Sequence, residues 1–197
     1  FRMPESYFIG TDVFHAFKKD NGLLHVMNQK YKSASEIRAE FPQIQKDFAA
    51  GTLPDYINKM LANLLHGLGK TPLVVRSSSL LEDSLGTSFA GKYDSVFCPN
   101  QGSVDENLER LTSAISQVYA SVYSADALIY RRRMGLLDYD ERMAILLQVV
   151  EGERHDNFYH PHFSGVAFSR NPYKWTSRIQ REDGLLRMVC GLGTRAV

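Results

Sequence analysis

The residues from Arg76 to Gly91 combine the side chains and glycines that bind phosphate groups. The apolar run 72–75 (PLVV) is typical of a buried strand, and we expect that strand to end at Arg76. A guanidinium presents its N–H donors in a fixed fork that fits phosphate oxygens. Serines 77–79 and the small-residue loop 86–91 (GTSFAG) follow, and such residues let backbone N–H groups approach a polyphosphate closely. This stretch therefore predicts a polyphosphate-binding loop after a strand, with an ordinary polar hairpin as the alternative.

Motif and composition narrow the function classes. No GxxxxGK[ST] motif occurs in the sequence, which excludes a P-loop. The net charge of +1 over 197 residues gives no excess of positive charge that would bind nucleic acid or acidic lipids. We therefore expect neither nucleic acid nor a membrane as partner. No apolar stretch reaches the ~20 residues that span a bilayer. Cys98 and Cys190 are the two cysteines, without a C-x-x-C motif, so we expect a reducing cytoplasm and neither a structural disulfide nor a zinc site.

Helical and strand patterns alternate along the chain. The apolar spacing predicts helices over residues 11–19, 33–48, 53–68, 103–122 and 124–135, and strands over 72–76, 95–98, 143–150, 165–168 and 186–190. This mixture favours an α+β or α/β fold with a mixed sheet and flanking helices over an all-helical one.

Local signals mark several helix ends. Ser103 with Glu106 fits a capping box, and either Ser33 or Ser35 caps the second helix. Thr11-Asp12 is expected to cap the first helix. Pro42 is expected to perturb the middle of the second helix, because proline removes a backbone donor.

The segment 151–161 is polar and is expected to be a mobile connection. His155, His160 and His162 lie in or next to it and are candidate metal ligands. Neither a cysteine nor a carboxylate is spaced to complete such a site, so we favour a polar loop over a metal centre.

Three blocks of the sequence resemble one protein family. Residues 75–95, VRSSSLLEDSLGTSFAGKYDS, resemble VRSSATAEDLPGASFAGQYDT, the signature of the nucleotide-binding domain of phosphoenolpyruvate synthase and pyruvate phosphate dikinase. Residues 146–150 (LLQVV) and 164–172 (SGVAFSRNP) resemble the family's VQ-x-M and SGVxFTxxP, and 191–193 (GLG) are similar to its GLGE. The likeness covers at least residues 72–197, with weaker similarity over residues 7–14.

The resemblance implies an ATP-grasp fold, in which two α+β lobes hold ATP between them. Residues 1–197 would form part of such a domain. The parent protein would use ATP and Mg²⁺ to phosphorylate a histidine on a separate domain and then convert pyruvate to phosphoenolpyruvate. The family's lysine-bearing GGKG loop is expected before Phe8, and its metal ligands, phosphohistidine domain and pyruvate-binding barrel beyond Val197. Thr194 stands where the family has the glutamate of GLGE, so an acidic role there is not expected.

The same resemblance suggests the cofactor-binding residues, with no catalytic residue and no metal ligand among them. Arg76 matches the arginine that contacts the nucleotide phosphates, and Gly91 matches the last glycine of SFAG, where the backbone approaches ATP. Ser95 matches the threonine of YDT, and Gln148 matches the VQ glutamine on the adenine side. For Gly91 the alternative is a plain turn glycine, and for Ser95 it is a half-buried strand serine. For Gln148 the alternative is a core amide that is satisfied within the protein.

Two further matches carry weaker predictions. Glu82 and Asp83 match the family's acidic pair, and acids in the first turn of a helix are an equally good interpretation. Arg131 matches the arginine of a Tyr-Arg pair, and we expect it to pair within the domain before contacting phosphate.

Other functions remain open at this point. Related proteins use the same nucleotide module to phosphorylate antibiotics or glucans. A non-catalytic nucleotide-sensing module is the alternative from a different class.

Overall fold

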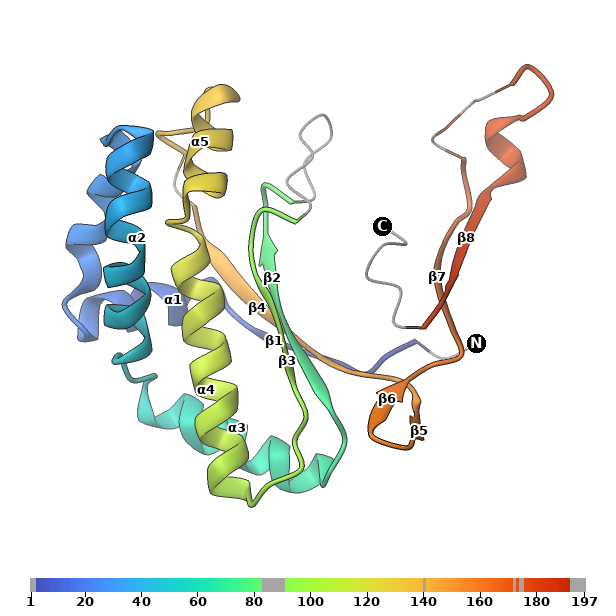
Figure 1. Cartoon of the computed structure of the whole chain (residues 1–197), viewed down its shortest axis with the longest axis horizontal. Coiled ribbons are helices and arrows are strands. Elements are labelled where there is room, and N and C mark those ends of the chain that lie inside the picture. Colours follow the sequence, from blue (N-terminus) through green and yellow to red (C-terminus); the bar gives the residue numbers. More distant parts are fainter. Residues whose placement is uncertain (1–2, 83–90, 140, 172, 174–175, 192–197) are drawn as a thin grey trace. The chain divides into compact units, whose positions relative to one another are not determined.

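The computed structural model describes residues 3–82, 91–139, 141–171, 173 and 176–191. The chain divides into two compact units, Phe1–Val149 and Val150–Val197, which are described separately (Figure 1). No helix within the described residues is long and apolar enough to cross a membrane.

The first unit is a four-stranded sheet with helices packed on one face. Its strands are β1 (Ser6–Ile9), β2 (Leu73–Ser79), β3 (Ser95–Cys98) and β4 (Met143–Val149), in the spatial order β1-β4-β2-β3. Its helices are α1 (Thr11–Asp20), the 3₁₀ segment η1 (Leu23–Tyr31), α2 (Ala34–Ala49), α3 (Asp55–Leu68), α4 (Val104–Ser121) and α5 (Ala125–Arg133). Figure 1 shows these helices on the same side of the sheet. The expected α+β class is confirmed.

The mixed sheet that we expected is not found, because all described strand pairs are antiparallel. β1 and β2 point in the same direction, and helices connect them, but β4 lies between them. β3 and β4 likewise point in the same direction across β2. The helical connections thus join β1 to β2 and β3 to β4, two pairs of strands that run in the same direction. Because a strand of the opposite direction lies between the members of each pair, all neighbouring strands are antiparallel.

The core lies between the sheet and the helices. Leu73 and Val75 of β2 and Ile145 of β4 are fully buried, as the inward positions of alternating strands should be. Aromatic rings fill the helical side: Phe14 packs on Tyr119 with ring centroids 4.8 Å apart. The apolar faces of the amphipathic helices thus supply the main stabilising burial.

Two capping boxes begin helices as the sequence indicated. Ser33, rather than Ser35, caps α2: its hydroxyl accepts from the Glu36 backbone N–H at 3.3 Å, and the Glu36 carboxylate accepts from the Ser33 N–H at 2.8 Å. Ser103 and Glu106 repeat this arrangement at α4. α2 runs through Pro42 as one helix, so proline does not interrupt it. The predicted Thr11-Asp12 cap is wrong, because both residues lie inside α1, and Gly10 precedes it without a side-chain cap.

β2 is longer than its apolar residues indicated. It pairs with β4 from Leu73–Val149 to Ser79–Met143, so Arg76 lies in the middle of the strand and not at its end. We interpreted serines 77–79 as loop residues, but they belong to β2 because each of them pairs with a residue of β4. The hydroxyl of Ser77 donates to the Glu82 carboxylate at 2.8 Å, which satisfies a polar group near the core.

The described residues of the second unit form two hairpins and a short 3₁₀ turn. β5 (Glu153–His155) pairs with β6 (Phe158–His160), β7 (Phe163–Phe168) pairs with β8 (Leu185–Cys190), and η2 spans Arg181–Asp183. We expected residues 151–161 to be a mobile connection, and their mobility stays a prediction. They fold into the β5–β6 hairpin, and Asp156 adopts the positive φ of 53° that its tight turn needs.

Candidate nucleotide-binding face

The sheet face opposite the helices carries three of the four predicted ligand residues, and we call it the open face. In antiparallel strands, directly paired residues point to the same side. Arg76 of β2 pairs with Ser95 of β3 on one side and with Leu146 of β4 on the other, and Leu146 pairs with Phe8 of β1. One row across the sheet is therefore Phe8, Leu146, Arg76 and Ser95.

Gln148 lies in the neighbouring row of the open face. It pairs with Val74 of β2 and with Ser6 of β1, and Val74 pairs with Phe97 of β3. Two residues along a strand correspond to about 6.5–7 Å, so Gln148 and Arg76 are diagonal neighbours. The sheet thus brings together residues that are far apart in the sequence.

The polar side chains of the open face contact one another. The Nη1 of Arg76 donates to the Oε1 of Gln148 at 3.4 Å, and the Nε2 of Gln148 donates to the hydroxyl of Ser6 at 3.1 Å. Arg76 is exposed to solvent. Phe8 and Phe97 are 71% and 49% exposed on the same face. A cation and a carboxamide framed by aromatic surface suit a ligand with phosphate and base groups.

The connection from β2 to β3 bears the remaining predicted ligand. Residues 83–90, which include Asp83 and most of the GTSFAG loop, lie outside the described residues. Gly91 adopts a φ of +75°, which favours glycine over other residues. This conformation agrees with the turn-glycine interpretation and leaves its approach to ATP a prediction. Residues 192–193 of the GLG block also lie outside the described part of the chain.

Glu82 organises the end of β2. Its carboxylate accepts from the hydroxyl of Ser77 at 2.8 Å and from the backbone N–H of Ser79 at 3.1 Å. Glu82 lies in a turn, and the residues that follow it are outside the described part of the chain, so its interpretation as an acid in the first turn of a helix stays a prediction. In the described structure, Glu82 satisfies donors at the end of β2.

Arg131 acts within the first unit. It is 4% exposed, and its Nη2 donates to the carbonyl of Tyr139 at 2.6 Å and to that of Leu136 at 3.4 Å. Burial raises the pKa of Tyr93, the Glu141 carboxylate raises it further, and the Arg131 guanidinium opposes the shift. Arg131 thus contacts backbone carbonyls within the first unit. The ion pair that we expected for it stays a prediction.

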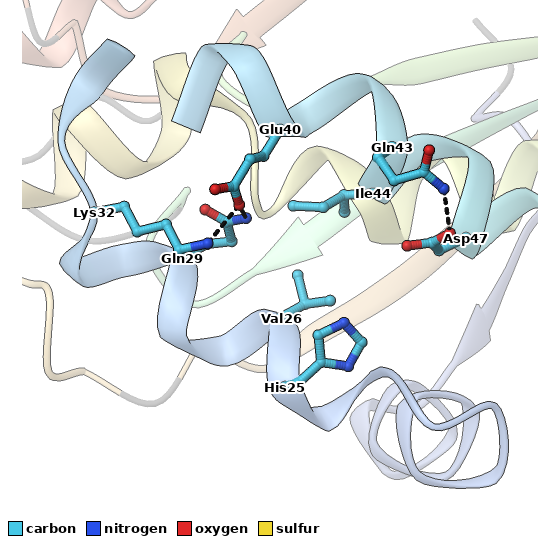
Figure 2. Close-up of a pocket in the computed structure, with 8 residues that line it drawn as sticks. All are labelled: His25, Val26, Gln29, Lys32, Glu40, Gln43, Ile44 and Asp47. Carbon is cyan, nitrogen blue, oxygen red and sulfur yellow. Dashed lines mark hydrogen bonds and ion pairs between the residues drawn. The ribbon is translucent and has the colours of Figure 1, made fainter. Parts of the chain in front are cut away.

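A pocket of about 180 Å³ lies elsewhere, between η1 and α2 (Figure 2). Lys32 and Gln29 both donate to the Glu40 carboxylate there. The Lys32 ammonium is the main cause of the lowered pKa of Glu40, with Gln29 second. Because its lysine is already paired with a carboxylate, this pocket is a poor site for phosphate.

Comparison with known proteins identifies the family. The family model for the pyruvate phosphate dikinase AMP/ATP-binding domain matches residues 1–197. The chain belongs to this family. The resemblance in the VRSS, SGV and GLG blocks is thus confirmed at the level of the family, and nucleotide binding follows as the property of its domain.

Several curated proteins are similar to this member of the dikinase AMP/ATP-binding family. A rifampicin phosphotransferase of Streptomyces sviceus is 26% identical over 188 residues, which cover 92% of this chain and 20% of that protein. The uncharacterized phosphotransferase YvkC of Bacillus subtilis is 27% identical, over 99% of this chain and 20% of its own. A phosphoenolpyruvate synthase of Aeropyrum pernix is 23% identical, over 97% and 23% respectively. The chain spans about a fifth of the length of these relatives.

The structure explains one glycine of the family-like SGV block. A Cβ on Gly165 of β7 would lie 2.2 Å from the backbone carbonyl oxygen of Arg187 on β8. Backbone atoms in a paired strand cannot move aside easily, so only glycine fits. Strand packing therefore explains why this position of the block is a glycine.

Proposed function

We propose that the open face binds ATP, with Arg76 contacting the phosphates and Gln148 contacting the adenine. The observation that carries the proposal is the placement of Arg76, Ser95 and Gln148 on one uncovered sheet face in a chain of the AMP/ATP-binding family. Gly91 would bring backbone N–H groups near the phosphates. An ATP-grasp fold for the whole nucleotide-binding domain is part of the proposal.

The chemistry expected of Arg76 is charge neutralisation. Phosphoryl transfer depends on positioning and on cations that stabilise charge on the transferred group. The Arg76 guanidinium donates to the neutral Gln148 amide at 3.4 Å. A charged triphosphate oxygen is a stronger hydrogen-bond acceptor than this amide oxygen. ATP would therefore displace this contact and free the Gln148 carboxamide for the base.

Mg²⁺ is expected from the family resemblance, and the described open face does not provide its protein ligands. Mg²⁺ favours carboxylate and phosphate oxygens. The described residues that point to this face are uncharged except Arg76: Ser6, Phe8, Val74, Ser78, Ser95, Phe97, Ala144, Leu146 and Gln148.

In the whole protein, we propose a phosphotransferase that moves a phosphoryl group from ATP to a histidine on another domain, and then to pyruvate. The similarity to a phosphoenolpyruvate synthase supports this acceptor. A second candidate is an antibiotic acceptor, because proteins named rifampicin phosphotransferase match the chain at 25–26% identity.

The test is a phosphorylation assay on the whole protein that contains this chain. Two samples of ATP, one labelled at the β-phosphate and one at the γ-phosphate, show which phosphoryl group is transferred. One of them should leave an acid-labile label on a histidine, and added pyruvate should take up that label as phosphoenolpyruvate. Discharge by rifampicin and not by pyruvate would establish the second candidate. ATP binding without any protein labelling would contradict both and favour a nucleotide-sensing module.

A further inference from the structure

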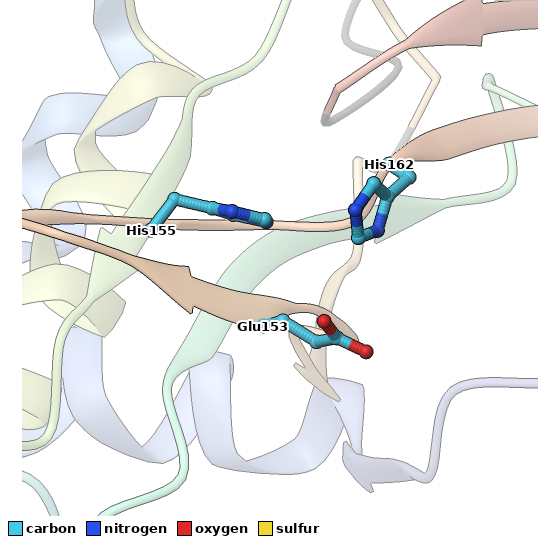
Figure 3. A group of neighbouring side chains, drawn as sticks. All are labelled: Glu153, His155 and His162. Carbon is cyan, nitrogen blue, oxygen red and sulfur yellow. The ribbon is translucent and has the colours of Figure 1, made fainter.

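The second unit gathers Glu153, His155 and His162 into one cluster (Figure 3). Each of the three side chains offers a metal-ligating atom, and these atoms all lie within 4.8 Å of one another. All three belong to residues 150–197, so the cluster does not depend on how the two units are placed.

Strand register explains how these residues meet. Glu153 and His155 are two apart on β5 and therefore point to the same face of the hairpin. His160 of β6 pairs with Glu153, so it shares that face. Its ring stacks on His155 with centroids 4.5 Å apart at 22°, while the His162 ring meets His155 edge-on at 5.0 Å and 85°. The stack holds the His155 ring in place, and His162 approaches it from the segment that precedes β7.

One nitrogen of the cluster is left without a partner. The Nε2 of His155 is buried and has no hydrogen-bond partner among the described residues. A buried polar atom of this kind costs free energy unless a ligand or another group satisfies it. The neighbouring nitrogen and carboxylate ligands point to a cation as that group.

We propose that Glu153, His155 and His162 bind a zinc-class divalent cation. Imidazole nitrogen suits Zn²⁺ and similar transition metals, whereas Mg²⁺ favours oxygen ligands only. Two histidines and one glutamate form a ligand set of known zinc sites, with the fourth position taken by water. Zinc–ligand bonds are about 2.0–2.2 Å long, so small side-chain rotations would draw the three ligand atoms together.

The cluster corrects one of our expectations. We judged that no carboxylate was spaced to complete the histidines, but Glu153 lies beside two of them. Glu153 is only two residues before His155, a spacing that becomes meaningful once both lie on one face of a strand.

The cation would tie the β5–β6 hairpin to the start of β7. Two ligands lie on β5, and His162 immediately precedes Phe163, the first residue of β7. The unpaired part of this connection is short, so closing it costs little entropy. Metal binding would therefore stabilise the fold of the second unit.

Titration of ZnCl₂ into the metal-free chain, followed by calorimetry and by thermal unfolding, tests the proposal. We expect one Zn²⁺ per chain, a higher melting temperature on binding and no comparable effect of MgCl₂. Co²⁺ in place of Zn²⁺ should give the visible absorption of a four-coordinate site. His155→Ala and His162→Ala should each weaken Zn²⁺ binding by about tenfold or more, and Glu153→Gln should weaken it while keeping side-chain size.

His66→Ala is the matched control, because His66 is an exposed histidine on α3 in the first unit. It should leave Zn²⁺ affinity unchanged. Circular dichroism of the metal-free proteins shows which variants are folded. If a histidine variant fails to fold, Zn²⁺ titration of folded Glu153→Gln against the wild type still tests the site. Absence of stoichiometric Zn²⁺ binding to the folded wild type, or binding that survives both His162→Ala and Glu153→Gln, would overturn the proposal.

Discussion

Arg76 and Gln148 are 72 residues apart in the sequence, yet the guanidinium of one donates to the carboxamide of the other at 3.4 Å. They lie on adjacent strands, β2 and β4, and both belong to the sheet face that the helices of the first unit leave open. This contact joins the residue proposed for the phosphates to the residue proposed for the base. Each proposed role can therefore be tested by changing one member of the pair.

Replacing Arg76 by alanine should weaken ATP binding by about 1.5–3 kcal/mol, the range for hydrogen bonds to charged groups. Adenosine lacks phosphates and should bind the variant and the wild type equally well. Calorimetric titration of both ligands measures the difference. Arg133→Ala, at an exposed arginine of α5, is the matched control and should bind ATP as the wild type does. Equal ATP affinities for Arg76→Ala and wild type would remove Arg76 from the site.

Gln148→Leu should reduce the preference for ATP over GTP more than it reduces stability. The substitution keeps the size of the side chain roughly but deletes the amide that would distinguish the two bases. Competition binding with ATP and GTP, together with urea unfolding, separates the effects. Ser6→Ala removes the hydroxyl that accepts from the Gln148 Nε2 and leaves the Gln148 carboxamide itself in place. Should both variants lower stability equally and leave the nucleotide preference intact, Gln148 is a structural amide.

Arg131→Met should lower the free energy of unfolding by about 1.5–3 kcal/mol, because it deletes charged hydrogen bonds to the carbonyls of Tyr139 and Leu136. Those carbonyls would then lose a buried donor. Arg133→Met, on the exposed side of the same helix, should change stability by no more than ~0.5 kcal/mol. Urea unfolding of both variants gives the comparison, and a nearly neutral Arg131→Met would contradict the anchoring role.

The two thiols should react very differently. Burial raises the pKa of Cys98 to about 11, against an ordinary value of 9.0, whereas Cys190 is exposed. At pH 8 a thiol reagent should label one cysteine in the folded chain and both in urea. Cys190→Ser should leave a thiol that reacts only on unfolding. Rapid labelling of folded Cys190→Ser would show that Cys98 is accessible.

The raised pKa of Cys98 also has a consequence for stability. The unfolded chain loses the thiol proton near pH 9.0, while the folded chain keeps it until about pH 11. Raising the pH through this window therefore stabilises the unfolded state, and the free energy of unfolding falls. Cys98→Ala should show a shallower fall between these pH values in denaturant unfolding. An identical pH slope in the variant would contradict the linkage.

The sequence by itself determined the features that depend on neighbouring residues. The capping box of Ser103 and Glu106, the strand Ser95–Cys98 and the amphipathic helices follow from contacts a few residues apart. The VRSS and SGV blocks were sufficient to indicate the family, because their residues are consecutive. The burial of Arg131 and its hydrogen bonds to the carbonyls of Leu136 and Tyr139 agree with the role inside the domain that we expected for it.

The tertiary structure decided which distant residues share a surface. Pairing with β4 extended β2 through its serines and moved Arg76 from a strand end to the middle of an open sheet face. Strand pairing likewise turned the polar segment around His155 into a hairpin and placed Glu153 beside His162. Such pairings depend on long-range register, which one slipped residue would reverse, so local sequence patterns do not encode them.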